Sequence, residues 1–303
     1  MTIQNHVTKN IVKNVLLSKD YRIEVVNLIN AQFLQFSIDF FKKVVDAKLH
    51  SKDITIEWYR KSFLNKNLPS DEIAINSGLN KKTISNMYRS ATKQIVIDAA
   101  NEHFEALYET IQSLVDNNDE IDLTLTIKLK GVSVDLNVSE SLIVINTLAV
   151  KRAALRGGLW STVGKQAEKF LMLALCKIYK VNEQYYNAEH FVKNRNLDVD
   201  REIDFYLKNG ERQYKCEVKL MGQGNPESAD AIIARGSEVF VADTLSEQNK
   251  NQCDQLDVCW VACRDFEGYK NFKKALDKFK IPYTDYQGDL EKDLPNILDD
   301  LFE

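Results

Sequence analysis

The chain has 303 residues, a hydrophobic content of 44% and a formal net charge of −4 at pH 7. These values are typical of an ordinary globular protein with a sizeable core, built as one large domain or two medium ones. No run of about 18 apolar residues lacks charges, and the N-terminus has no basic segment before an apolar run. We therefore expect a cytoplasmic protein that neither spans a membrane nor is exported.

Charge is divided unevenly along the chain. Residues 1–100 hold 15 Lys and Arg against 9 Asp and Glu, whereas the remainder holds 25 against 35. A basic front part followed by an acidic back part fits a DNA-binding module joined to a domain that concentrates carboxylates around a metal ion. The five cysteines form no CxxC pair and have no histidine at zinc-ligand spacing, so we interpret them as reduced, buried thiols.

Residues 1 to about 118 are predicted to be helical, because their apolar residues recur at spacings of three and four. Within this part, residues 70–90 are typical of a helix-turn-helix. Ala74 is small where two helices would cross, Gly78 would form the turn, and Asn80 would cap the second helix. The apolar residues expected to pack between the two helices are Ile73, Leu79, Ile84 and Met87.

The second of these helices is predicted to contact DNA through exposed hydrogen-bonding side chains. They are Lys81, Lys82, Ser85, Asn86 and Arg89. Lys and Arg would bind phosphates, and Asn86 and Arg89 are the candidates for reading base edges. The alternative is an ordinary helical hairpin whose basic residues are solvated, but the local excess of positive charge favours DNA.

From Asp122 the apolar period changes to two, which predicts a β-hairpin around Gly131 and a domain boundary near residue 120. Helices are then expected over 139–155 and 162–179, separated by a loop that contains Gly157, Gly158 and Trp160. Further on, strands are expected at 200–208, 211–220, 238–243 and 257–262, with helices at 226–235 and 268–279. The predicted fold class is α+β, with a helical domain at 1–120 and, at 121–303, a mixed sheet flanked by helices.

The sequence Asn209-Gly210 is the strongest short hairpin signal in the chain. If these residues form the turn, residue 208 pairs with 211 and residue 204 with 215. Side chains alternate between the faces of a strand, so one face would be apolar and meet a core. The opposite face would carry Glu202, Asp204, Lys215, Glu217 and Lys219.

Three carboxylates and two lysines on one patch leave room for a further cation, because like charges in neighbouring strands repel. Mg²⁺ is the natural candidate, since it prefers carboxylate oxygens, retained waters and substrate phosphate. The metal would polarise a scissile phosphate, while Lys219 would position the attacking water or stabilise negative charge. The pattern thus indicates phosphodiester hydrolysis. The alternative is that Glu217 and Lys219 form an ordinary surface ion pair.

One pattern resembles the PD-(D/E)XK motif of restriction-endonuclease-type nucleases. It consists of Asp204, twelve intervening residues and Glu217-Val218-Lys219, with Ile203 in place of the proline. The stretches 157–168 and 217–230 resemble the CfrBI-like group of type II restriction endonucleases, and the resemblance covers roughly residues 150–262. It implies that the C-terminal domain has a restriction-endonuclease-like core. It also implies four catalytic residues, Asp204, Glu217, Lys219 and Glu168, and three metal ligands, Asp204, Glu217 and Val218.

For Glu168 the alternative is a surface ion pair with Lys165, about one helical turn away. Gln223 lies between two glycines and is a candidate for contact with DNA phosphate, although a flexible connector would explain the glycines equally well.

The resemblance implies a type II restriction endonuclease that hydrolyses double-stranded DNA with Mg²⁺ and leaves 5′-phosphate ends. It would act as a homodimer, since both strands of a palindrome are most simply cut by two such centres related by a twofold axis, and would pair with a cognate DNA methyltransferase. Two alternatives stay open. One is a nuclease of the same fold in DNA repair, and the other is a helix-turn-helix regulator with a non-cleaving C-terminal domain.

Overall fold

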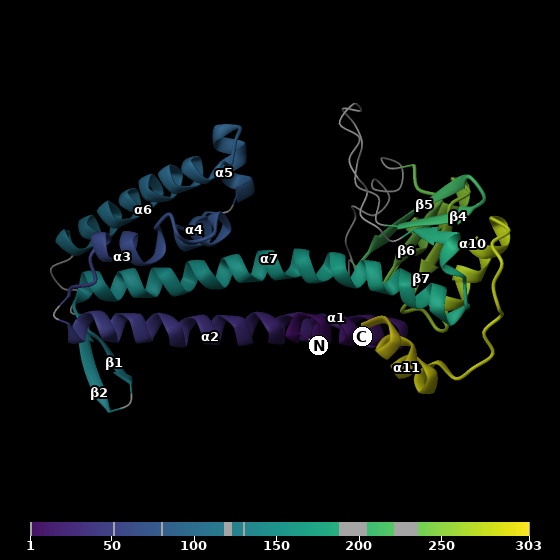
Figure 1. Ribbon diagram of the computed structural model, residues 1–303, viewed down its shortest axis with the longest axis horizontal. Coiled ribbons are helices and arrows are strands. Elements are labelled where there is room, and N and C mark those ends of the chain that lie inside the picture. Colours follow the sequence, from purple (N-terminus) through teal and green to yellow (C-terminus); the bar gives the residue numbers. More distant parts are fainter. Residues whose placement is uncertain are drawn as a thin grey trace. The chain divides into compact units, whose positions relative to one another are not determined.

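The computed structural model describes residues 2–50, 52–79, 81–117, 123–129, 131–187, 205–220 and 236–302 (Figure 1). It has the predicted α+β fold, and within these ranges no helix is long and apolar enough to cross a membrane. In chain order the elements are α1 (Ile3–Leu16), α2 (Arg22–Leu49), α3 (Ile56–Phe63), α4 (Ser70–Asn76), α5 (Lys81–Tyr88), α6 (Lys93–Asp116), β1 (Leu125–Leu129), β2 (Val132–Leu136), α7 (Val138–Ile178), η1 (Glu183–Tyr185), β3 (Tyr186–Asn187), β4 (Phe205–Asn209), β5 (Arg212–Lys219), β6 (Val239–Ala242), α9 (Glu247–Gln255), β7 (Cys259–Ala262), η2 (Gly268–Asn271), α10 (Phe272–Lys278) and α11 (Leu290–Phe302).

The chain forms two compact units, and the boundary between them does not fall at residue 120. One unit comprises Met1–Leu28 and Trp160–Glu303, and the other comprises Ile29–Leu159. The helices α2 and α7 each contribute residues to both units. The predicted division at residue 120 separates a DNA-recognition part from a nuclease part, and as a statement about function it stays a prediction.

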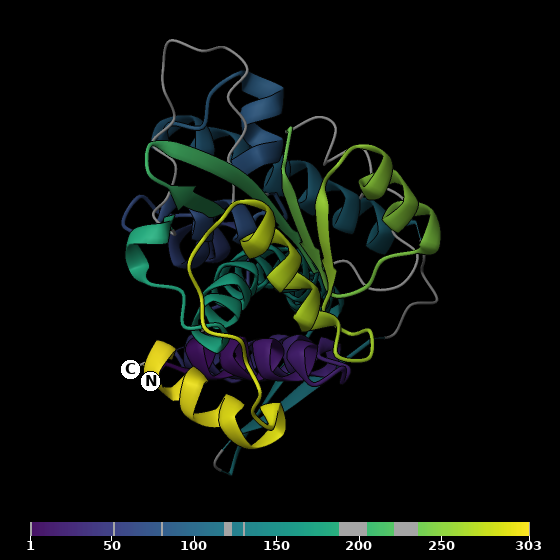
Figure 2. The same ribbon diagram turned by 90° about the vertical axis from the view of Figure 1, so that its right-hand side faces the viewer.

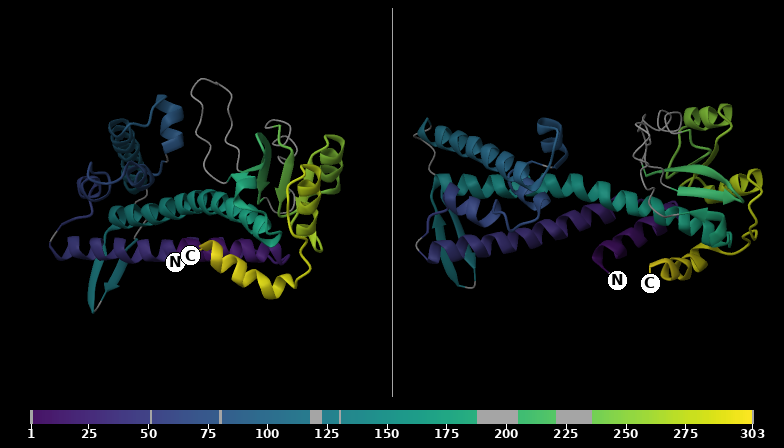
Figure 3. Two further views of the ribbon diagram at one scale, coloured as in Figure 1. Left: turned by 45° about the vertical axis from the view of Figure 1, so that its right-hand side comes forward. Right: turned by 45° about the horizontal axis from the view of Figure 1, so that its top comes forward.

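Among the described residues of the unit Ile29–Leu159, the regular structure is helical except for the β1–β2 hairpin. Its core is lined by apolar side chains at helical spacing, including Tyr59 and Phe104, whose stacked rings have centroids 4.0 Å apart. The hairpin is antiparallel, pairs Leu125 with Leu136, and turns at Gly131, whose φ is +84°. Figure 3 shows the hairpin beside the last turns of α2 and the first turns of α7. The predicted hairpin is confirmed.

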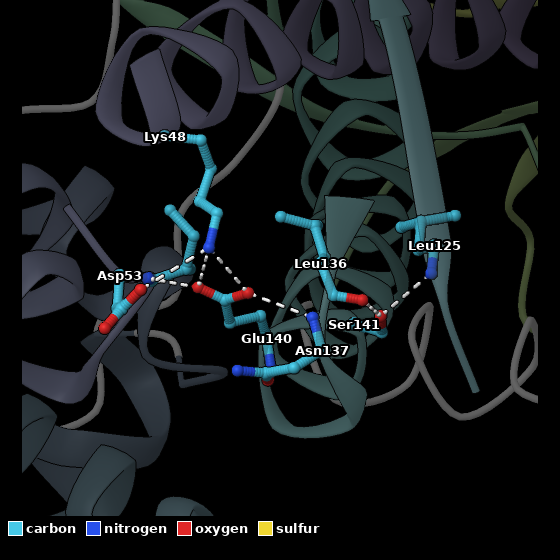
Figure 4. A network of polar contacts seen from close by, with 8 residues as sticks. Lys48, Asp53, Leu125, Leu136, Asn137, Glu140 and Ser141 are labelled. Atoms are coloured by element: carbon cyan, nitrogen blue, oxygen red, sulfur yellow. Dashed lines mark hydrogen bonds and ion pairs between the residues drawn. The ribbon is translucent and has the colours of Figure 1, made fainter. Parts of the chain in front are cut away.

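A buried carboxylate joins the elements of this unit where α7 begins (Figure 4). Glu140 is 2% exposed and accepts hydrogen bonds from Lys48 Nζ (2.9 Å), the Ile54 amide (2.8 Å) and the Asn137 amide (3.0 Å). In return, Asn137 Oδ1 accepts from the Glu140 amide at 2.9 Å, which completes a capping box. Three donors, from α2, from the segment before α3 and from the residue before α7, thus depend on one side chain.

The other unit is built on a five-stranded mixed sheet with the order β3-β4-β5-β6-β7. The first three strands are antiparallel, and β5, β6 and β7 run parallel. All four residues of β6 are buried, as expected of a parallel strand covered on both faces. Figure 2 looks nearly along α7 and shows the twist of this sheet. The predicted mixed sheet is confirmed.

All five cysteines are free thiols, and four of them are buried, with Cys259 half-buried. Burial raises the pKa of the Cys216 thiol, so this thiol stays protonated at neutral pH. The interpretation of the cysteines as reduced, buried thiols agrees with this arrangement.

The predicted loop between two helices at residues 156–161 is wrong. The helix α7 runs without a break from Val138 to Ile178, through Gly157, Gly158 and Trp160. Each glycine costs a helix only about 1 kcal/mol relative to alanine. Apolar residues pack into buried cores on both sides of this stretch, at Val144 and Val163, and this packing outweighs the cost. The predicted helix 226–235 lies outside the described residues.

We predict that Glu140→Ala loosens the unit Ile29–Leu159. The substitution removes the acceptor of the buried Ile54 amide and of the Asn137 amide, and also the buried partner of Lys48, which costs about 3 kcal/mol. Measured by mass spectrometry, hydrogen exchange of buried amides in this unit accelerates by roughly 100-fold.

The matched control is Asp39→Asn, which removes an exposed carboxylate paired with Lys42 on α2. It leaves exchange unchanged. Equal protection in Glu140→Ala and the wild type would contradict the assigned role of Glu140.

Candidate active site

The strands β4 and β5 form the predicted hairpin, but in a register shifted by two residues. Asn209 pairs with Arg212 and Phe205 with Cys216, and Gly210 takes a φ of +61° in the turn. The prediction had residue 208 opposite 211. A shift of two residues preserves the alternation of faces. The described residues of the predicted apolar face are accordingly buried from Phe205 to Val218, namely Phe205, Leu207, Tyr214, Cys216 and Val218.

A distant contact explains the shift. The Asn209 side chain donates to the carbonyl oxygens of Phe279 (3.0 Å) and Lys280 (3.2 Å), which follow α10. This anchor keeps Asn209 in the strand and leaves Gly210 and Glu211 to form the turn. The favoured use of Asn-Gly as a two-residue turn therefore gives way to a tertiary hydrogen bond.

Glu217 is buried completely, with 0% exposure, although it lies on the predicted polar face. Its Oε1 atom is 2.9 Å from Lys219 Nζ, and the Lys219 side chain is 28% exposed. Removing a carboxylate from water costs several kcal/mol unless it is paired. The alternative of an ordinary surface ion pair is therefore wrong, because the acid of this pair has no contact with solvent.

The parallel neighbour β6 explains this burial. Glu217 lies opposite Phe240, and Lys219 lies opposite Ala242. Phe240 and Ala242 belong to an apolar cluster with Leu245, Cys253, Val258 and Ala262. The acid is thus held at the edge of a core while Lys219, two residues further along, reaches toward solvent.

Glu168 on α7 approaches the end of the same strand. It is 9% exposed, and its Oε1 atom accepts a hydrogen bond from the Leu220 amide at 3.2 Å. The carboxylate is thus buried against the main chain that follows β5. The structure therefore brings Glu168, Glu217 and Lys219 to one end of β5.

The hydrogen bonds at this end fix the direction of the Val218 carbonyl. The Lys219 carbonyl accepts from the Asp243 amide at 3.3 Å, so it points toward β6. Successive carbonyls in a strand point to opposite sides, so the Val218 carbonyl points toward β4. The Leu220 amide, which donates to Glu168, points to that side as well. Two oxygen donors, from Glu168 and Val218, thus lie on the same side of β5.

Asp204 and Gln223 lie outside the described residues, and so does His190. Within the ranges that the structure describes, no group of three or more His, Cys, Asp or Glu could hold a metal ion. The carboxylate and carbonyl oxygens of Glu217, Glu168 and Val218 are nevertheless the donor types that suit Mg²⁺.

Asp243 is an acid that the sequence reasoning missed. It is 0% exposed and directly follows β6, next to the end of β5. The sequence feature that could have indicated it is an acidic residue directly after the apolar run 239–242. In the structure this run is β6, which pairs in parallel with β5.

In the unit Ile29–Leu159, the predicted pair of helices at 70–90 is present as α4 and α5. Gly78 forms the turn with a φ of +89°, and Ile73, Ala74 and Ile84 are buried. The expectation for Met87 is wrong, since its side chain is 61% exposed. The helix α5 has only eight residues, and its last turn lies at the surface. DNA binding by this pair stays a prediction.

The proposed DNA contacts of α5 differ in their surroundings. Ser85, Asn86 and Arg89 are exposed. Lys81 Nζ is 3.2 Å from Asp71 Oδ2, so this lysine joins the two helices by an ion pair. The side chain of Lys82 lies outside the description.

Comparison with known families identifies the chain. The model of the CfrBI restriction endonuclease family matches residues 5–250, from α1 to α9. The protein is thus a restriction endonuclease, a nuclease of restriction-modification systems that hydrolyses DNA. Within that class it belongs to the CfrBI restriction endonuclease family. The match begins far before residue 150 and includes α4 and α5, and it ends at residue 250. Comparison with curated proteins and with solved structures found no match.

We predict that Lys219→Met destabilises the metal-free protein by about 3 kcal/mol, because it leaves the buried charge of Glu217 without its cation. Adding Glu217→Gln removes that charge and restores at least half of the loss. Unfolding in urea is measured in the presence of EDTA for both single variants and the double variant, with tryptophan fluorescence as the signal.

The double variant makes this test independent of any general effect of substitution. Losses that simply add would contradict a direct interaction between the two side chains.

Proposed function

We propose that this chain is a type II restriction endonuclease that cuts double-stranded DNA at a short specific sequence, with Mg²⁺ as its cofactor. The products are 5′-phosphate and 3′-hydroxyl ends. The observation that carries the proposal is the fully buried Glu217, 2.9 Å from Lys219, at the end of a strand that the family match includes.

Glu217, the Val218 carbonyl and Asp204 would hold the Mg²⁺ ion. Asp204 precedes Phe205 in the chain, and Phe205 pairs with Cys216, the residue before Glu217. Glu168 adds a carboxylate on the side of β5 to which the Val218 carbonyl points. Bound there, Mg²⁺ supplies Lewis-acid polarisation of the scissile phosphate.

Lys219 changes its partner during the reaction. Before metal binds, its ammonium compensates the charge of Glu217. With Mg²⁺ held by Glu217, Lys219 would instead donate a hydrogen bond to the attacking water or to the negative charge that develops on the phosphate. Water attacks phosphorus directly, and no covalent enzyme intermediate forms.

The helix pair α4–α5 would bind the duplex. Asn86 and Arg89 would read base edges, while Ser85, Lys81 and Lys82 would contact phosphates. Gln223, after the ExK strand in sequence, would contact the backbone near the cut. Two copies would form a homodimer on a palindrome, in the cytoplasm, where a cognate DNA methyltransferase protects the cell's own sites.

We predict that the purified protein cuts plasmid DNA into discrete fragments with Mg²⁺ and not with EDTA, and that Glu217→Ala cuts none. Gel electrophoresis is the measurement. Glu211→Ala is the matched control, because it removes an exposed acid in the turn of the same hairpin and should leave cutting unchanged.

A specific gel shift with intact DNA under every condition would instead support a non-cleaving regulator. Nicking or trimming without discrete fragments would support a nuclease of DNA repair.

We predict that Arg89→Ala weakens binding to the cognate site by about 10- to 100-fold and relaxes base preference, as expected for a contact to a base edge. Gel shifts are measured in the Glu217→Ala background, so that no DNA is cut. Lys128→Ala, on β1 of the same unit, is the control with unchanged affinity. Unchanged affinity in Arg89→Ala would remove α5 from the DNA interface.

A further inference from the structure

Asp243 is a buried acid to which the proposed mechanism assigns no task. It is 0% exposed, and its Oδ2 atom accepts a hydrogen bond from the Tyr21 hydroxyl at 3.3 Å. Tyr21 is 3% exposed and lies between α1 and α2. Burial and the nearby Asp243 carboxylate raise the pKa of Tyr21, so its hydroxyl stays protonated at neutral pH and can donate. A carboxylate buried at such cost needs a reason.

The position of Asp243 in the sheet suggests that reason. Ala242 pairs with Lys219, and the Asp243 amide then donates to the Lys219 carbonyl. The Lys219 carbonyl and the Leu220 amide belong to one peptide group, and the Leu220 amide donates to Glu168 on the opposite side of the strand. The peptide that follows Lys219 is thus held from both sides, by Glu168 and by Asp243.

We propose that Tyr21 and Asp243 are positioning residues of the nuclease centre. The Tyr21 hydroxyl fixes the Asp243 side chain, and with it the main chain that holds the Lys219 carbonyl. The Lys219 side chain and the Val218 carbonyl are both attached to the main chain of Lys219. A displacement of that main chain would therefore move the Lys219 ammonium and the Val218 carbonyl together. This inference rests on the proposed nuclease function.

Through this hydrogen bond the N-terminal segment would help to position the nuclease centre. Residues Met1–Leu28 belong to the compact unit that contains the sheet, although more than a hundred residues of the other unit separate them in sequence. Tyr21 is the residue of this segment that donates to the end of β6.

The test is Tyr21→Phe, which removes only the hydroxyl oxygen. Cleavage of an oligonucleotide duplex with Mg²⁺ is followed under steady-state conditions. We expect kcat to fall about tenfold while KM and the thermal midpoint stay unchanged, because misplacement of a catalytic group affects the chemical step. Tyr283→Phe removes a hydroxyl that donates to Asp277 at 2.7 Å, and as the matched control it keeps full kcat.

Substitutions of Asp243 provide the second arm. Asp243→Asn keeps an oxygen that accepts from Tyr21 and retains most of the activity, whereas Asp243→Leu loses it. Unchanged kcat in Tyr21→Phe, or a loss confined to KM, overturns the inference. Equal losses in the Asn and Leu variants with a raised Mg²⁺ requirement also overturn it, because they would assign Asp243 to the metal. A wild type that does not cut DNA defeats the proposed nuclease function instead.

Discussion

The charge of Glu217 is the constraint on which the unit with the five-stranded sheet depends. This carboxylate is removed from solvent completely, and only a close cation makes such burial tolerable. Lys219, two residues along the same strand, provides that cation at 2.9 Å and remains partly exposed. A buried acid beside a partly exposed ammonium contributes little to stability, because burying the charge costs about as much as the pairing returns. It is useful where a divalent cation and a phosphate are to be bound in turn.

The surroundings of this pair come from parts of the chain that are far apart in sequence. Glu168 extends from α7 to the main chain after Lys219, and the Asp243 amide holds that main chain from β6. Tyr21 then supports Asp243 from the N-terminal segment. Three separate stretches therefore meet at the end of β5, which explains why the unit joins Met1–Leu28 to Trp160–Glu303. A centre assembled in this way depends on the fold of the whole unit.

The features that depend on neighbouring residues in the chain could be predicted from the sequence. The alternation along residues 205–219 gave the buried face of β5, and apolar spacing gave the helices of the N-terminal part. The register of β4 and β5 could not be predicted, because Asn209 bonds to carbonyls 70 and 71 residues away. The burial of Glu217 escaped prediction for the same reason, since it depends on Phe240 in a neighbouring strand. Asp243 was missed because its partner Tyr21 is 222 positions distant.

Binding of a divalent metal by Glu217 and its neighbours, as proposed above, can be tested directly. Fe²⁺ in place of Mg²⁺, with ascorbate and peroxide, releases hydroxyl radicals that cut the polypeptide next to the bound ion, and the fragments can be mapped by mass spectrometry. We expect cuts near residues 168, 204 and 217–219, all suppressed by excess Mg²⁺ and absent in Glu217→Ala. Cuts elsewhere, or cuts that neither Mg²⁺ nor the substitution changes, would contradict it.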